Sequence, residues 1–194
     1  ANGGGFYLGT EGQPVFDNCI IEDNGDYNGE RTDNGGNGYI GSSRFTMSNS
    51  TIKDGRAEQY AAGLYIYNSE AIVTFNNCDF LNNNNYYYQA QGGSIYCSGE
   101  RLVINDCYFY DNTGKGYGGG IYLTAGNTYI DNSEFKNNYS GSSSYNGKGG
   151  AIYFGSNDSL VISRSKFIGN YSSGNSSNYN AYGGAIYIYG SDHV

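Results

Sequence analysis

Short stretches of alternating apolar and polar residues recur along the whole chain, and each follows a pair of glycines or other small residues. In a clear example, the apolar Ile121 and Leu123 flank Tyr122 directly after three glycines. A period of two predicts a β-strand, because successive side chains of a strand point to opposite faces. The first apolar residues of these stretches are Phe6, Tyr39, Leu64, Ile95, Ile121, Ile152 and Ile186. Six steps separate Phe6 from Ile186, so the mean repeat is 30 residues.

A second apolar position follows each of the first six stretches after 13 to 16 residues. The residues at this position are Ile21, Ile52, Phe80, Phe109, Phe135 and Phe167. The distance from this position to the next stretch varies more widely, from 12 to 19 residues. Each repeat therefore combines a half of nearly fixed length with a loop of free length, and loops tolerate insertions because closure entropy grows slowly with length.

Residue types that return at the same phase predict a solenoid in which each coil hydrogen-bonds to the next, about 4.8 Å away. A helical fold is disfavoured by the 32 glycines and by the lack of a 3.6-residue period. A β-sandwich would also have short strands, but it does not need the same residue types in every repeat. We therefore predict an all-β fold, a parallel β-helix of about six coils with a mean repeat of about 30 residues.

Asparagine stands three residues after five of the six second apolar positions, and Gly55 takes that place in the remaining repeat. The asparagines are Asn24, Asn83, Asn112, Asn138 and Asn170. Stacked coils would place these amides above one another, where they could form a hydrogen-bonded ladder. Alternatively, asparagine is present because it tolerates a left-handed turn conformation. Both interpretations are structural, and the sequence favours neither.

The two alternating motifs resemble the paired repeats of the chlamydial polymorphic outer-membrane protein family. One motif is seen in Gly149-Gly150-Ala151-Ile152, and the other is the Phe-x-x-Asn that begins at Phe135 and ends at Asn138. Their alternation covers nearly the whole chain. The resemblance implies a pectin-lyase-like, right-handed parallel β-helix that is exposed at a cell surface and used in adhesion.

We expect one β-helix domain over residues 1–194, which is a segment of a longer solenoid or a subunit that stacks on copies of itself. The sequence begins and ends at nearly the same phase of the repeat. A β-helix without caps exposes backbone donors, acceptors and apolar core at its ends. Matching ends suit end-to-end self-association into an open fibre.

Tyrosine follows the first apolar residue in six of the seven stretches, and Ile40 stands there in the other. These tyrosines are Tyr7, Tyr65, Tyr96, Tyr122, Tyr153 and Tyr187. We expect them to form an exposed aromatic stripe along the solenoid. One explanation is strand propensity with neighbour stacking, worth about 0.2–1 kcal/mol per pair. The other is a flat face that binds sugar rings or a second rod.

The cysteines offer one candidate disulfide. Cys78 and Cys107 share a phase in consecutive repeats, which would bring their Cα atoms to about 5 Å, within range of a bridge. The alternative is that all four cysteines are buried thiols that act as small apolar residues. The chain has no Cys-x-x-Cys spacing that would suggest zinc.

Five Asn-x-Ser/Thr sequons favour an extracellular or cell-surface location. Asn138 and Asn170 belong to the proposed ladder, where a glycan cannot fit. We therefore expect glycans at Asn157 and Asn175 first, and at Asn49 third. Chance sequons are the alternative explanation in a chain so rich in asparagine and serine.

Charge and residue distribution narrow the functional classes. The formal net charge of −8 argues against nucleic acid and anionic membranes as partners, and no apolar run is long enough for membrane insertion. Acidic residues share no phase, whereas polysaccharide lyases and hydrolases need clustered carboxylates. The segment from Asn24 to Gly29 resembles half of a calcium loop, but Gly35 stands where a bidentate Glu is needed. We expect no metal and no cofactor.

The sequence therefore predicts a non-catalytic extracellular structural protein, either a subunit of a surface fibre or the stalk of an adhesin. One alternative is a carbohydrate-binding module that uses the tyrosine stripe. The other, with less support, is a polysaccharide-active enzyme. End-to-end copies of the chain and glycans are the partners that these functions imply.

Overall fold

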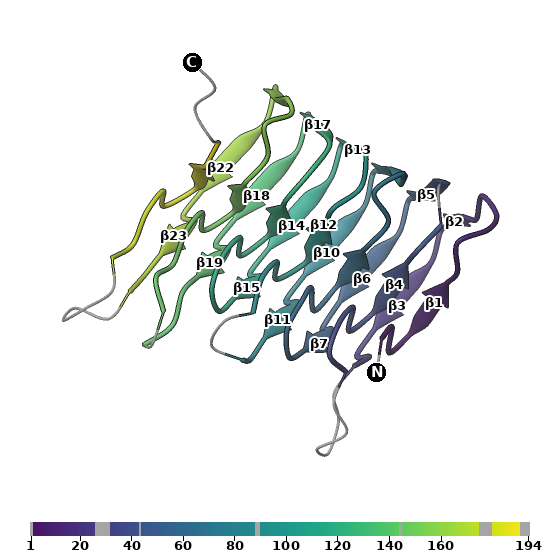
Figure 1. Cartoon of the computed structure of the whole chain (residues 1–194), viewed down its shortest axis with the longest axis horizontal. Helices are drawn as coiled ribbons and strands as arrows, with labels where there is room; N and C mark the ends of the chain where they lie inside the picture. Colours follow the sequence, from purple (N-terminus) through teal and green to yellow (C-terminus); the bar gives the residue numbers. More distant parts are fainter. Residues whose placement is uncertain are drawn as a thin grey trace.

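Figure 1 shows a computed structural model of the chain, in which short strands wind coil after coil around one axis. The structure describes residues 2–25, 32–42, 44–87, 90–143, 145–174 and 180–190. Within these ranges the regular structure is all β, and the strands form four parallel sheets. The coils follow one another from the purple N-terminal end to the yellow C-terminal end.

The first sheet collects the strands that follow the glycines: β1 (Phe6–Leu8), β4 (Gly38–Ile40), β8 (Leu64–Ile66), β12 (Ile95–Cys97), β16 (Ile121–Leu123), β20 (Ile152–Phe154) and β24 (Ile186–Ile188). The second sheet comes next in each coil: β2 (Val15–Asp17), β5 (Arg44–Ser48), β9 (Ile72–Asn76), β13 (Arg101–Asn105), β17 (Asn127–Asp131) and β21 (Leu160–Ser163). The third sheet carries the second apolar position: β3 (Ile20–Glu22), β6 (Thr51–Lys53), β10 (Asp79–Leu81), β14 (Tyr108–Tyr110), β18 (Glu134–Lys136) and β22 (Lys166–Ile168). The fourth sheet has strands of two residues: β7 (Arg56–Ala57), β11 (Asn84–Asn85), β15 (Thr113–Gly114), β19 (Tyr139–Ser140) and β23 (Tyr171–Ser172).

Each strand pairs in parallel with its counterpart in the next coil, without a shift of register. Ile95 pairs with Ile121, and Ile121 pairs with Ile152, so identical side chains lie on successive rungs. This stacking confirms the parallel β-helix that the repeat predicts. Six coils reach the third sheet, and β24 begins a further one.

The register of the second coil differs from the sequence prediction by one residue. Tyr39 pairs with Tyr7 on one side and with Tyr65 on the other, and Gly38 takes the place of the first apolar residue. Ile40 is therefore a buried core residue rather than part of the outward stripe. The predicted phase of the second coil was wrong because Gly38, and not an apolar residue, stands at the first apolar position. The ring of Phe6 occupies the space that a side chain at Gly38 would need.

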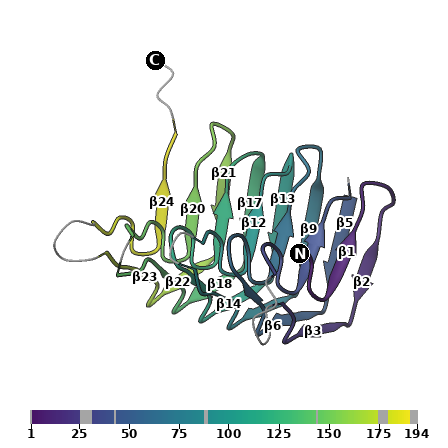
Figure 2. The same ribbon diagram turned by 60° about the horizontal axis from the view of Figure 1, so that its bottom comes forward.

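Single residues with positive φ turn the chain sharply between the second and third sheets, which meet at an angle in Figure 2. These residues are Asn18, Asn49, Asn77, Asp106, Asn132 and Arg164. Asparagine and aspartate accept this conformation more readily than other side chains, because their short polar groups bond locally. The sharp corner explains why only two residues separate the strands of the two sheets.

The core inside the coils is a stack of like side chains. Phe80, Phe109, Phe135 and Phe167 lie face to face, with ring centroids 4.5, 4.5 and 4.9 Å apart. The first three rings are fully buried, and each burial stabilises the fold by about 1.5–3 kcal/mol. The Phe of the Phe-x-x-Asn motif thus packs the interior, while its Asn lies at the next corner.

Candidate functional site

The asparagines of the Phe-x-x-Asn motif form a buried ladder of amides. Asn112 shows the pattern: its Nδ2 donates to Asn138 Oδ1 at 2.9 Å and to the carbonyl oxygen of Phe80 at 2.9 Å. Its Oδ1 accepts from the backbone N–H of Asn83 at 3.0 Å. Asn83 and Asn138 repeat these contacts, and the ladder continues to Asn170.

The ladder decides between the two explanations for these asparagines. The residues with positive φ at this corner are the ones just before the ladder positions, such as Asn82, Asp111 and Asn137. The ladder asparagines themselves are not in that conformation. They are therefore present for their hydrogen bonds between coils, and the explanation from turn tolerance is wrong.

Asn37 repairs the ladder where Gly55 interrupts it. Its Nδ2 donates to Asn83 Oδ1 at 3.1 Å and to the carbonyl oxygen of Lys53 at 2.9 Å, and its Oδ1 accepts from Asn24 Nδ2 at 3.0 Å. A Cβ on Gly55 would lie 2.6 Å from Asn37 Nδ2, so the glycine makes the room that Asn37 needs. Sequence reasoning missed Asn37, although a polar residue among the small residues after the glycines was a usable signal.

We expect Asn37→Ala to lower the free energy of unfolding by about 2–4 kcal/mol, because a fully buried side chain loses three hydrogen bonds. Asn84→Ala is the matched control: Asn84 is exposed, and its amide donates only locally, to the carbonyl oxygen of Asn82. Urea unfolding followed by circular dichroism measures both. An equal loss in the two variants would show that Asn37 does not bridge the ladder.

Serine and cysteine form a second ladder at the corner between the second and third sheets. Cys107 accepts from the backbone N–H of Cys78 at 3.4 Å, and Ser133 accepts from that of Cys107 at 3.1 Å. Each Sγ or Oγ also donates to the carbonyl oxygen two residues earlier. The thiols therefore take the place of the serine hydroxyls of the other coils.

Cys78 and Cys107 lie in adjacent coils as expected, and all four cysteines are free thiols in the structure. The disulfide between them stays a prediction. The hydrogen bond with Cys78, together with burial, raises the pKa of Cys107, and burial raises the pKa of Cys97 to about 11. These two thiols are therefore protonated near neutral pH, which slows their oxidation.

The glycosylation candidates differ in their surroundings. Asn157 is exposed in the loop between β20 and β21. Asn49 is exposed at a corner, and its Nδ2, the atom to which a glycan would be attached, donates to Asp17 Oδ1 at 2.8 Å. Asn175 lies outside the described residues. Glycosylation stays a prediction at all three positions.

The predicted stripe exists as a continuous tyrosine row that also includes Tyr39. Its members are Tyr7, Tyr39, Tyr65, Tyr96, Tyr122, Tyr153 and Tyr187, with ring centroids of neighbours 4.6–5.5 Å apart. The prediction of an exposed stripe is wrong for part of the row, because exposure varies from 60% at Tyr7 to 6% at Tyr65 and 8% at Tyr153.

A second set of side chains covers the middle of the tyrosine row. These side chains belong to the residue before the glycines in each coil, where Tyr60 packs on Tyr65 and Tyr117 packs on Tyr153. Lys148 Nζ lies 5.0 Å from the ring centre of Tyr117 and 5.2 Å from that of Tyr187. Burial raises the pKa of Tyr153 to about 12, so this hydroxyl stays neutral at physiological pH. The covered part of the row therefore acts as packing.

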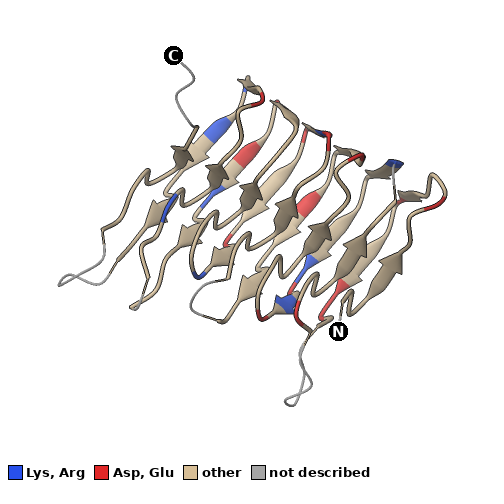
Figure 3. Cartoon of the chain, in the orientation of Figure 1, with Lys and Arg blue, Asp and Glu red and all other residues tan. Residues whose placement is uncertain are grey.

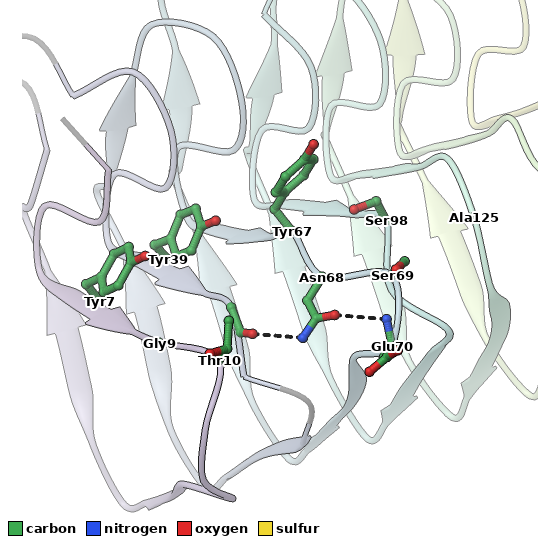
Figure 4. Close-up of a pocket in the computed structure, with 11 residues that line it drawn as sticks. Tyr7, Gly9, Thr10, Tyr39, Tyr67, Asn68, Ser69, Glu70, Ser98 and Ala125 are labelled. Atoms are coloured by element: carbon green, nitrogen blue, oxygen red, sulfur yellow. Dashed lines mark hydrogen bonds between the residues drawn. The ribbon is translucent and has the colours of Figure 1, made fainter.

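The row remains open near its N-terminal end, beside a groove of about 870 Å³. We call this the tyrosine groove, and Figure 4 shows its lining. Its aromatic members are Tyr7, Tyr39 and Tyr67, and its polar side chains are Thr10, Asn68, Ser69, Glu70 and Ser98. It is a shallow cleft with aromatic and hydroxyl groups, of a size typical for small-ligand sites.

Charged residues are scattered over the molecule, as Figure 3 shows. The ion pairs join neighbouring coils, for example Lys53 Nζ with Glu22 Oε2 at 2.6 Å. Among the described residues no group of three or more His, Cys, Asp or Glu could hold a metal ion. The calcium-like segment falls mostly on residues 26–31, outside the described ranges. The same ranges contain no helix that is long and apolar enough to cross a membrane.

Comparison with known proteins supports the fold. A family described as "Right handed beta helix region" matches residues 1–194. Neither a curated protein nor a solved structure gives a significant match. The pectin-lyase-like handedness is thereby supported, whereas the resemblance to the chlamydial repeats stays a prediction. Since the match covers the full sequence, the chain belongs to the right-handed β-helix family.

Proposed function

We propose that the chain is a non-catalytic structural element of an extracellular surface, either part of a fibre or the stalk of an adhesin. The main support is that the side chains with the most specific contacts bind coil to coil. The asparagine ladder, the phenylalanine stack and the tyrosine row all run parallel to the axis. Such contacts stiffen a rod without creating a pocket for chemistry.

The ladders also resist bending and fraying. Each interior rung is held by backbone bonds of the sheets and by buried side-chain amides on both sides. In a solenoid, stability is roughly a sum of repeat terms and nearest-neighbour terms, so every ladder bond adds to the coupling between coils. A rod of this kind suits a spacer that holds a binding surface away from a cell.

The open ends favour contact with further coils. Phe6, Phe16 and Ile21 are only partly buried at one end, whereas their counterparts in the middle coils are fully buried. They line a hollow of about 430 Å³. Ile162 and Phe167 are partly buried at the other end. Because the two ends repeat the same pattern, one can stack on the other as a heterologous contact.

We expect the purified chain to form larger rods as its concentration rises, and we expect Phe16→Lys to prevent this. The lysine would place a charge in the stacking face, where Phe16 lies against Phe6 and Phe45. Val15→Lys is the matched control, because Val15 is the neighbouring residue of β2 and points outward. Sedimentation velocity over about a thousandfold concentration range measures the size of the assembly.

Ile162→Lys and Val161→Lys form the same pair at the other end, in β21. Circular dichroism checks that all four variants keep the fold. If the unmodified chain stays monomeric over the whole range, end-to-end stacking of separate chains is wrong. If Val15→Lys blocks assembly as strongly as Phe16→Lys, the contact is lateral rather than end to end.

A further inference from the structure

The tyrosine groove follows from the lengths of the loops that join the first sheet to the second. Six residues separate β1 from β2 and five separate β8 from β9, but only three separate β4 from β5. The short connection lies between two longer ones, and residues from all three connections line the groove. Tyr39 and Gly41 line the groove at the second coil, and Figure 4 shows Tyr39 between Tyr7 and Tyr67.

Two exposed tyrosines are held in place by rings beneath or beside them. Tyr7 is 60% exposed and stacks on Tyr39, with ring centroids 4.6 Å apart and planes 11° apart. Tyr67 is 56% exposed and stacks on the buried Tyr65, 5.5 Å away with planes 8° apart. Because both rings are supported, a ligand that covers them loses little side-chain entropy on binding.

The loop that carries Tyr67 is also fixed. Asn68 Nδ2 donates to the carbonyl oxygen of Gly41 in the coil below at 2.8 Å. Asn68 Oδ1 accepts from the backbone N–H of Glu70 at 3.0 Å, and the Asn68 carbonyl accepts from Ala71. A Cβ at Gly41 would lie 3.1 Å from the carbonyl oxygen of Leu8 and 3.2 Å from Tyr39 Cε1, so the glycine keeps this part of the groove free of a side chain.

We propose that the tyrosine groove binds an extended, neutral saccharide. Flat aromatic faces next to hydroxyl groups complement sugar rings, which present apolar C–H faces and polar edges. Tyr7, Tyr39 and Tyr67 supply the faces, and Thr10, Ser69 and Ser98 supply hydroxyls. This assignment is narrower than a sugar-binding stripe along the whole solenoid, because most of the tyrosine row is covered.

The charge of the lining selects against acidic sugars. Among the described residues that line the groove, Glu70 is the one charged side chain, and none is a lysine or an arginine. Glu11 and Glu100 are exposed in the same set of loops. An anionic ligand would meet the carboxylate of Glu70 and no basic group among the lining residues, so uronic acids and sulfated sugars are disfavoured.

The length of the groove indicates an oligosaccharide rather than a single sugar. Its lining comes from five successive coils, from Tyr7 in the first to Ala125 in the fifth. Four steps of about 4.8 Å give a length of roughly 19 Å along the axis. A chain of several sugar rings that runs parallel to the axis would contact all of these coils.

Calorimetric titration with four hexasaccharides tests this assignment: β-linked glucose, N-acetylglucosamine, glucosamine and galacturonic acid. We expect at least one of the two neutral hexamers to bind, and the acidic one not to bind. Tyr67→Ala should weaken neutral binding by about tenfold or more, since an exposed aromatic anchor is lost. Tyr67→Phe keeps the flat face and should bind within about threefold of the unmodified chain.

Tyr171→Ala is the control, because Tyr171 is an exposed tyrosine of β23, outside the groove. It should leave the affinity unchanged. Absence of binding by both neutral hexamers overturns the proposal, and so does equal weakening by Tyr171→Ala and Tyr67→Ala. If glucosamine binds best and Glu70→Gln abolishes its binding, the groove is a cation site instead. These results leave the assembly of the rods untouched, so the two proposals fail separately.

Discussion

We expect Gly119→Val to lower the free energy of unfolding by more than about 4 kcal/mol, which places it among the largest effects of single substitutions. A Cβ at Gly119 would lie 2.2 Å from the carbonyl oxygen of Gly150 and 2.3 Å from that of Tyr139. Both atoms belong to backbone that is bonded to neighbouring coils, so neither can move alone. Thermal unfolding followed by circular dichroism should show a fall in Tm of roughly 8–16 °C.

Gly9→Val is the matched control, because no heavy atom lies within 4 Å of its added Cβ. It should change Tm by no more than about 2 °C, as an exposed substitution without contacts. The third coil carries Ala62 at the place of Gly119, so a single methyl group is tolerated in one coil and valine is the sharper test. A Tm for Gly119→Val within that range would show that the coils can separate locally at no cost.

The two glycines of the motif are required for different structural reasons, which the sequence alone does not distinguish. The first glycine has a positive φ in these coils: 62° at Gly118, 69° at Gly92 and 66° at Gly149. It is required because other residues rarely adopt this conformation. The second glycine serves close approach of three strands. A repeat identifies both positions as special, but only the coordinates show which constraint acts at each.

The fold was predictable because each coil has to satisfy its neighbours. Strands that stack without a shift of register need side chains of the same size at the same phase. This requirement produces a repeat that can be recognised in the sequence. The exception was the second coil, where Gly38 and Asn37 replace an apolar and a small residue. Both replacements compensate for a neighbour, Phe6 in one case and Gly55 in the other. In each case the two residues lie in different coils. The sequence of the second repeat alone therefore departs from the pattern for no visible reason.

The tyrosine row was located by its phase, but its exposure was not. Whether Tyr65 or Tyr153 faces water depends on Tyr60 and Tyr117, which come from the irregular part of the coil. The groove depends in the same way on the lengths of three loops. Loop length has only a small effect on stability, because closure entropy changes slowly with it, so the repeat does not constrain it. The rigid half of the repeat therefore predicts the rod, and the variable half decides which surface is open.

The amide ladder makes the second large prediction, which concerns Asn112→Asp. The carboxylate cannot donate to the carbonyl oxygen of Phe80 or to Asn138 Oδ1, which receive hydrogen bonds of 2.9 Å from Asn112. At neutral pH we expect a loss of about 3–5 kcal/mol in the free energy of unfolding, because one oxygen of a buried carboxylate then faces two acceptors. Urea unfolding at a series of pH values measures this loss relative to the unmodified chain.

The pH dependence has a definite sign. Burial and the two facing acceptors raise the pKa of the new carboxyl, and the two N–H donors of Asn83 lower it. We expect the first two effects to outweigh the donors, so that the folded-state pKa lies above the value of about 3.9 in the unfolded chain. The protonated carboxyl is then the form that the fold prefers. The loss should be smallest below pH 3.9 and should grow as the pH rises from there to the folded-state pKa. Above that pKa the loss should be constant.

Asn112→Ala separates the effect of charge from that of the missing hydrogen bonds. It removes the same amide without adding a titratable group, so its loss relative to the unmodified chain should not change with pH. Asn84→Asp adds a carboxyl at an exposed position of β11 and should cost less than about 1 kcal/mol at any pH. If Asn112→Asp loses as much stability at pH 3 as at pH 7, the carboxyl has turned to solvent. The ladder would then tolerate the removal of a rung, and the coupling between coils would rest on the backbone and the phenylalanine stack.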